Sequence, residues 1–127
     1  MSGMLRELFF FAITWSIGGT TNLQGREKFD KWVRERMQKS GMAFPEEKLI
    51  YDYTWDTEEK TWKSWHETIK EYVVDTKASY ETIVVPTLDS IRMKWLMRCL
   101  LMGNKHVMIP GPTGTGKSIY TEELLRD

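Results

Sequence analysis

The sequence predicts a mixed α/β fold in which helix predominates. Apolar residues recur at helical spacing through the first 41 of the 127 residues. Aromatic and β-branched residues concentrate in the middle of the chain, which favours strands there. Near the C-terminal end, a short apolar run, a glycine-rich loop and a segment of helix-forming composition follow one another. Short strands among longer helices indicate helices packed against a small sheet.

Composition excludes several classes of protein. The 18 basic and 18 acidic side chains cancel, and no half of the chain carries a long run of one sign, so we expect neither nucleic-acid nor membrane-surface binding. The most apolar stretch, Leu8–Gly19, is apolar for about ten residues, whereas a helix that spans a bilayer needs about 20. The single cysteine, Cys99, has apolar neighbours and is expected to be a buried, reduced thiol in a cytosolic setting.

Two helices are expected at the N-terminal end. The first begins near Leu5 and stops at "IGGT", residues 17–20, and its almost all-round apolar surface should be enclosed on several sides. The second occupies residues 25–41 and ends near Gly41. Its apolar face is predicted to contain Phe29, Trp32, Val33, Arg36 and Met37.

A break in periodicity at "GMAFPEE", residues 41–47, is the best predicted boundary, and it divides the chain into residues 1–44 and 45–127. Beyond it, "LIYDYTWD" and "TWKSWHETI" flank the polar "TEEK" and are interpreted as a strand pair, although the spacing of Trp62, Trp65 and Ile69 also fits a helix. A further strand is expected over "YETIVV", residues 80–85.

The C-terminal third should alternate helix and strand. Pro86 and Thr87 open a helix that stops at Gly103, with Leu88, Ile91, Trp95 and Cys99 on one face. Residues 107–109 form a brief apolar run typical of a buried parallel strand, and "SIYTEELLRD" has helix-forming composition. The order is therefore strand, glycine loop, helix.

The loop itself, "GPTGTGKS", carries the strongest functional signal. Gly111, Gly116, Lys117 and Ser118 satisfy the phosphate-binding loop pattern. Glycines permit backbone angles that other residues avoid, so successive amides from Thr113 to Ser118 can converge on phosphate oxygens. The following helix adds the positive end of its dipole. The lysine supplies a full charge for the β- and γ-phosphates, and the serine hydroxyl can ligate Mg²⁺. The alternative interpretation is a glycine-rich surface turn with no binding function.

No catalytic residue is predicted. Hydrolysis at such a loop also needs an acidic residue that lies tens of residues further on, and Asp127 is interpreted as an exposed terminal carboxylate. The acidic "DTEEK", residues 56–60, reads as a solvated turn. His66 and His106 are far apart in the sequence and predict no metal site made of protein ligands alone. Ser118 has no nearby base that could make it a nucleophile.

Several segments, in this order, resemble an axonemal-type dynein heavy chain over nearly the whole chain. "TWSIGG" and "GREKFD" are similar to the helical lid that closes the second AAA ATPase module of the motor ring. "VVPTLDSIR" and the glycine loop resemble the opening of the third module. The resemblance therefore implies a lid segment followed by the beginning of a P-loop AAA nucleotide-binding domain.

In that family, ATP binding and hydrolysis drive movement along microtubules, and the third module is usually a regulatory nucleotide site. The resemblance implies ATP or ADP with Mg²⁺ as cofactors, with Ser118 at the metal. The residues expected to hold phosphate are Gly111, Pro112, Thr113, Gly114, Thr115, Gly116, Lys117 and Ser118. Those expected near the adenine are Val84, Val85 and Pro86.

The implied partners are the rest of the motor ring and, through the parent protein, dynein intermediate and light chains and microtubules, in the cytoplasm and cytoskeleton of the ciliary axoneme. The family's Mg²⁺-organising acid, sensor residues, arginine finger, stalk and microtubule-binding tip have no counterpart in these residues. We therefore expect a fragment or truncated product that turns over no ATP alone. The alternative function is a nonenzymatic interaction module with a vestigial phosphate-binding loop, in which paired helices and exposed aromatics dock onto a partner.

Overall fold

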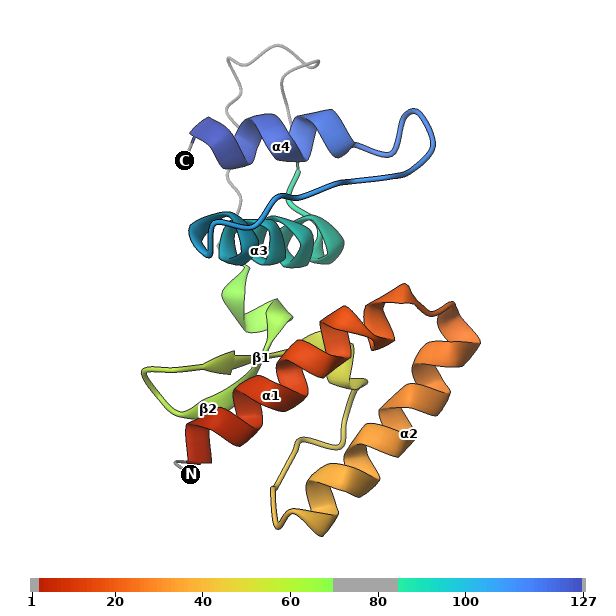
Figure 1. Cartoon of the computed structure of the whole chain (residues 1–127), viewed down its shortest axis with the longest axis vertical. Helices are drawn as coiled ribbons and strands as arrows, with labels where there is room; N and C mark the ends of the chain where they lie inside the picture. The colour runs from red at the N-terminus through yellow and green to blue at the C-terminus, as the bar shows by residue number, and fades with distance from the viewer. Residues whose placement is uncertain (1–2, 70–84, 127) are drawn as a thin grey trace. The chain divides into compact units, whose positions relative to one another are not determined.

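A computed structural model describes residues 3–69 and 85–126 of the chain. It comprises two compact units, Met1–Thr68 and Ile69–Asp127, each of which is described by itself (Figure 1). The first unit contains helices α1 (Gly3–Ser16) and α2 (Leu23–Lys39) and strands β1 (Tyr53–Asp56) and β2 (Thr61–Ser64). The second contains helices α3 (Leu88–Met102) and α4 (Lys117–Arg126). Helices and one small sheet confirm the mixed, mainly helical fold.

Helix α1 confirms the first predicted helix and ends where the glycines begin, followed by the short 3-10 helix η1 (Gly18–Thr20). Its buried face contains Phe10 and Thr14, whose hydroxyl donates to the Phe10 carbonyl at 2.8 Å. Phe9 is 59% exposed, so the expected enclosure on several sides is not seen in the part of the chain that the structure describes. None of the described helices is long and apolar enough to cross a membrane.

Helix α2 confirms the second predicted helix, including its end. The Asn22 side chain caps it by accepting the Gly25 amide at 2.9 Å, and Gly41, two residues past the end, has φ 71°. The predicted apolar face was partly wrong, because Trp32 is 46% exposed. The buried face instead contains Asp30, Val33 and Met37. A pattern of apolar residues could not predict that the Asp30 carboxylate is buried.

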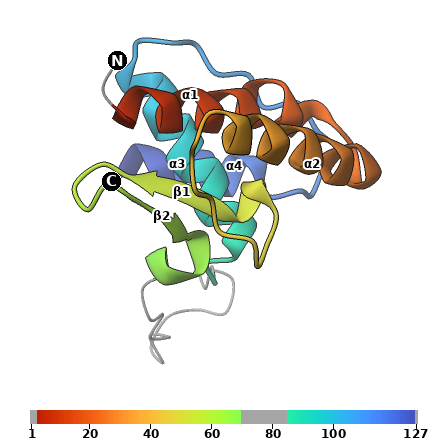
Figure 2. The ribbon, with the colours of Figure 1, turned by 90° about the horizontal axis from the view of Figure 1, so that it is seen from below.

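The core of the first unit joins the helix pair to the chain beyond it. Buried residues from α1, α2 and the segment before β1 form the cluster Phe10, Val33, Met37, Ile50 and Tyr51. The β hairpin lies beside α1 (Figure 2), with which β1 makes direct contacts.

A glycine is required where η1 meets this core. A Cβ added to Gly18 would lie 2.5 Å from the Tyr51 Oη and 2.6 Å from the Phe29 ring. The Tyr51 ring meets Trp15 edge to face at 5.8 Å, and burial raises the pKa of its hydroxyl. The "TWSIGG" segment therefore carries a close contact between the helix pair and the residues before β1.

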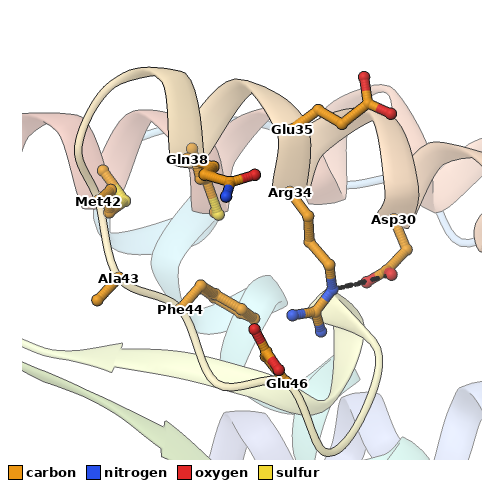
Figure 3. A pocket seen from close by; sticks show the side chains of 9 residues that line it. Asp30, Arg34, Glu35, Gln38, Met42, Ala43, Phe44 and Glu46 are labelled. Atoms are coloured by element: carbon orange, nitrogen blue, oxygen red, sulfur yellow. Dashed lines mark hydrogen bonds and ion pairs between the residues drawn. The ribbon is translucent and has the colours of Figure 1, made fainter.

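An ion pair on α2 holds the loop that leads to the hairpin. Both carboxylate oxygens of Asp30 accept from the Arg34 Nε, at 2.9 and 3.0 Å (Figure 3). The Asp30 Oδ1 also accepts the Ile50 amide at 2.8 Å. The remaining guanidinium nitrogens donate to the carbonyls of Pro45, at 2.6 Å, and Lys48. Arg34 also lines an open pocket of about 640 Å³ between α2 and this loop, but each of its three guanidinium nitrogens already donates within the protein.

The predicted strand pair is confirmed as an antiparallel hairpin. Tyr53 pairs with Ser64 and Asp56 with Thr61. In the connecting turn, Asp56 accepts the amides of Glu58 and Glu59 at 2.9 Å. Lys63 pairs with the Asp56 carboxylate at 2.8 Å, so the acidic turn is held by an ion pair as well as being solvated. The helical alternative for residues 62–69 survives only as the short 3-10 helix η3 (Trp65–Thr68).

The boundary predicted between residues 44 and 45 falls inside the first unit, which continues to Thr68. Glycine and proline broke the helical periodicity there, but the chain turns back onto the same core. Ile50 and Tyr51 are 3% and 2% exposed in the cluster they share with α1 and α2. Pro45 marks a turn within a domain and not its end.

In the second unit, α3 confirms the predicted helix. Thr87 and Ser90 form a reciprocal capping box, with the Ser90 amide 3.2 Å from the Thr87 Oγ1 and the Thr87 amide 2.9 Å from the Ser90 Oγ. The buried residues are Ser90, Arg92 and Met97. Cys99 is exposed, so its predicted burial is wrong for the described residues.

The predicted strand over residues 107–109 is wrong in the described structure, which assigns no strand there. Met108 is 87% exposed. A strand needs a hydrogen-bonded neighbour, and the described residues place none beside this run. The other predicted strand, residues 80–85, lies outside the described residues except for Val85.

We predict that Gly18→Ala lowers the free energy of unfolding of the first unit by about 1–3 kcal/mol, because the added methyl overlaps the Tyr51 and Phe29 side chains. Gly19→Ala is the matched control, since its Cβ would have no neighbour closer than 3.6 Å. Urea unfolding followed by tryptophan fluorescence measures the difference. Equal effects of the two substitutions would contradict the contact.

We predict that Asp30→Asn destabilises the first unit by about 3 kcal/mol, because the Arg34 guanidinium would lose its counter-charge in a largely buried site. Glu35→Gln, an exposed change on the same helix, should have little effect. The same unfolding measurement applies, and an unchanged midpoint for Asp30→Asn would show that the ion pair does not anchor the loop.

Candidate phosphate-binding loop

The glycine-rich loop connects residues 105–110 to the N-terminus of α4, which begins at Lys117 (Figure 1). Gly114 has φ 82° and Gly116 has φ 78°, in the left-handed region that side chains with a Cβ avoid. These two positions turn the chain back toward the helix start. The curled shape expected of a phosphate-binding loop is therefore present, with the unpaired first amides of α4 at its end.

The Lys117 side chain folds across the loop. Its ammonium donates to the Gly111 carbonyl at 2.8 Å, to the Pro112 carbonyl, and to the Thr115 hydroxyl oxygen at 3.1 Å. The Thr115 hydroxyl in turn donates to the Pro112 carbonyl at 2.9 Å. A full positive charge therefore lies against the main chain of the loop.

The three loop glycines differ in whether the structure requires glycine there. A Cβ on Gly111 would lie 3.5 Å from the Lys117 Cδ, at ordinary contact distance, so neither space nor backbone angle requires glycine there. A Cβ on Gly114 would meet no atom within 4 Å, so only its backbone angle requires glycine. A Cβ on Gly116 would lie 3.1 Å from the Tyr120 ring, so the ring would have to shift by a few tenths of an ångström in addition to the unfavourable backbone angle.

Ser118, the predicted metal ligand, is exposed at the first turn of α4. It lines an open cavity of about 450 Å³ together with Val107, Ile109, Lys117, Thr121 and Glu122. The Thr121 hydroxyl donates to the Lys117 carbonyl at 2.9 Å and is thereby used within the helix. The Ser118 hydroxyl is the accessible one of the two.

An ion pair that sequence reasoning missed ties α4 to α3. The Lys94 ammonium lies 2.6 Å from the Glu123 carboxylate, and both side chains are partly buried. The two residues are 29 positions apart, so no helical spacing connects them. Opposite charge was the only signal in the sequence, and it is too common to identify a pair.

The structure brings together the loop residues but describes less of the predicted adenine stretch. Val84 lies outside the described residues, Val85 is 58% exposed, and Pro86 comes one residue before the N-cap of α3. Asp127 is also outside the described part of the chain. No cluster of three or more possible metal ligands of the His, Cys, Asp or Glu type occurs among the described residues.

Comparisons with known proteins define the class to which these features belong. The family model described as the dynein heavy chain AAA lid domain matches residues 1–67, which is more than half of the chain. The model described as the P-loop containing dynein motor region matches residues 72–127. The chain therefore belongs to the dynein heavy chain family, and the resemblance found in the sequence is confirmed. The two matches follow the two compact units closely.

The curated relatives are axonemal heavy chains. The chain is 32% identical over 143 residues to human dynein axonemal heavy chain 1, covering 98% of this chain and 3% of that protein. It is 35% identical over 132 residues to human dynein axonemal heavy chain 12, with 92% and 4% covered. Mouse dynein axonemal heavy chain 2 is 31% identical over 126 residues, with 98% and 3% covered. The chain thus spans only a few hundredths of the length of these relatives.

We predict that Lys94 and Glu123 couple favourably by about 0.5–1 kcal/mol, because the pair is partly buried but still reached by water. A double-mutant cycle with Lys94→Met and Glu123→Gln, read by hydrogen exchange of the α4 amides, measures the coupling. Lys105→Met, an exposed change, serves as the control for loss of a positive charge. Additive effects in the cycle would show that the pair contributes nothing.

Proposed function

We propose that residues 111–118 bind the phosphates of Mg-ATP or Mg-ADP, and that this chain supplies the phosphate-binding loop of a regulatory nucleotide site in a dynein motor. The observation that supports this most is the curled main chain at Gly114 and Gly116, which lead directly into α4. The match of residues 72–127 to a P-loop dynein motor region supports it independently.

The residues present fit a polyphosphate. The amides from Thr113 to Ser118 lie where the loop curls and the helix begins, so they are suited to converge on anionic oxygens. Lys117 already holds its ammonium against the loop by donating to carbonyl oxygens. Anionic phosphate oxygens are stronger acceptors than those carbonyls, so the ammonium would exchange partners with little movement.

The exposed Ser118 hydroxyl would hold the Mg²⁺ that accompanies the nucleotide, and the metal would offset the charge of the phosphates. Val84, Val85 and Pro86 are proposed to lie near the adenine, which would place the base close to the start of α3. Both assignments carry the family pattern over to matching positions of this sequence.

The proposed position within the parent protein combines these matches with the resemblance of "TWSIGG", "GREKFD" and "VVPTLDSIR" to the junction of two modules. Residues 1–67 would close the second AAA module as its lid, and residues 72–127 would open the third. The partners would then be the remainder of the motor ring, dynein intermediate and light chains and microtubules, in the axoneme of a cilium. The ATP-dependent movement of that assembly is proposed for the parent protein and not for these 127 residues alone.

Mg-ATP titration of the 127-residue chain, followed by amide NMR shifts, tests this function because it detects weak binding and locates it. We expect saturable shifts in Gly111, Gly114 and Gly116, with no ATP turnover by the chain alone. Lys117→Ala should weaken binding at least tenfold, since a hydrogen-bonded charge typically contributes about 1.5–3 kcal/mol.

Lys105→Ala is the matched control, because it removes an exposed lysine from the turn before the loop. It should leave the affinity within about twofold, given the weak effect of exposed charges. Shifts that do not saturate, or that are unchanged in Lys117→Ala, would reject phosphate binding and favour the alternative of an interaction module with a vestigial loop. Steady-state phosphate release from the purified chain would contradict the expected lack of turnover.

A further inference from the structure

Tyr120 lies against the loop because of its position in α4. Side chains of a helix lean toward its N-terminus, so a residue covers the one four positions before it. Tyr120 is four residues after Gly116 and follows this rule. A Cβ built on Gly116 would lie 3.1 Å from the Tyr120 Cζ, 3.2 Å from Cε2 and 3.3 Å from the hydroxyl oxygen. The ring therefore occupies the space that a side chain at Gly116 would need.

The two glycines with positive φ differ in this respect. Gly114, at φ 82°, has no atom within 4 Å of its added Cβ, whereas Gly116, at φ 78°, has the Tyr120 ring. Gly116 is also held through its main chain, since its carbonyl accepts the Tyr120 amide at 3.0 Å. Tyr120 therefore restrains Gly116 both with its ring and with a main-chain hydrogen bond, whereas Gly114 has no such ring contact.

We propose that Tyr120 is a positioning residue for the phosphate-binding loop: its ring packs behind Gly116 and holds that peptide in the conformation in which the loop amides converge. This inference rests on the proposed function of the loop. Glycine populates positive and negative φ about equally, so an unsupported Gly116 would lose more conformational freedom on binding an anion. The ring removes part of that freedom beforehand.

The ring, and not the hydroxyl, carries this role. No hydrogen bond of the Tyr120 hydroxyl is found among the described residues. Packing against a glycine backbone needs only a flat side chain of the right size. Phenylalanine should therefore replace tyrosine at this position, whereas alanine should not.

Mg-ATP titration of the 127-residue chain, followed by amide NMR shifts, tests the inference. We expect the affinity of Tyr120→Phe to be within about twofold of that of the unmodified chain. The affinity of Tyr120→Ala should be about tenfold weaker, because the Gly116 peptide would lose the ring that restrains it. The helical circular dichroism of both variants should match that of the unmodified chain. Unchanged affinity in Tyr120→Ala would overturn the inference.

The two glycines supply an independent test that keeps Tyr120 in place. Gly114→Ala meets only the penalty of positive φ, but Gly116→Ala also meets the ring, so the second should weaken binding at least threefold more than the first. In chains that also carry Tyr120→Ala, this difference should disappear. Equal effects in the presence of Tyr120, or a difference that persists without it, would refute the support even if Tyr120→Ala failed to fold.

The outcomes separate this inference from the function on which it rests. Lack of saturable Mg-ATP binding by the unmodified chain rejects the proposed function and the positioning role with it. Binding that is lost in Lys117→Ala but unaffected in Tyr120→Ala rejects the positioning role alone. Binding that is weakened in Tyr120→Ala and restored in Tyr120→Phe supports both.

Discussion

The first unit depends on one ion pair whose two charged side chains are largely buried. Asp30 is 7% exposed, and its carboxylate joins the Arg34 guanidinium on the next turn of α2 to the amide of Ile50, 20 residues away. Arg34 also donates to two carbonyls of the intervening loop. These hydrogen bonds fix the loop against α2. Ile50 and Tyr51 consequently reach the core, and the hairpin that follows lies beside α1.

In the second unit, the path of the chain depends on the backbone angles of the glycine-rich loop. Two residues at positive φ turn the chain into the start of α4, and the lysine that follows them binds the carbonyls of the turn it has just completed. Both interactions are local, within seven residues, so they need few contacts with the rest of the protein. A glycine-rich loop of this pattern can therefore be found in the sequence, and it curls even though the neighbouring run 107–109 forms no strand in the described residues.

Local signals were predicted well from the sequence, and contacts between distant residues were not. The four helices among the described residues, the hairpin and the glycine loop follow from periodicity and from boundary residues such as Thr87 and Gly41. The predicted boundary lies inside the first compact unit, since a proline can equally end a domain or turn a chain within one. The burial of Asp30 and the exposure of Cys99 and Trp32 were missed because hydrophobic patterns give the face of a helix but not what covers it. The loop residues were found by pattern, whereas Lys94, Glu123 and Tyr120 have no pattern of their own.

The ion pair between Lys94 and Glu123 has a mechanical consequence. Helix α3 begins just after Val85 and Pro86, the stretch proposed for the base, and α4 begins at the loop proposed for the phosphates. The pair, with 2.6 Å between the Lys94 ammonium and the Glu123 carboxylate, is a modest restraint on the sliding of one helix along the other. Within the proposed site, this restraint would favour a joint movement of the base end and the phosphate end of the nucleotide.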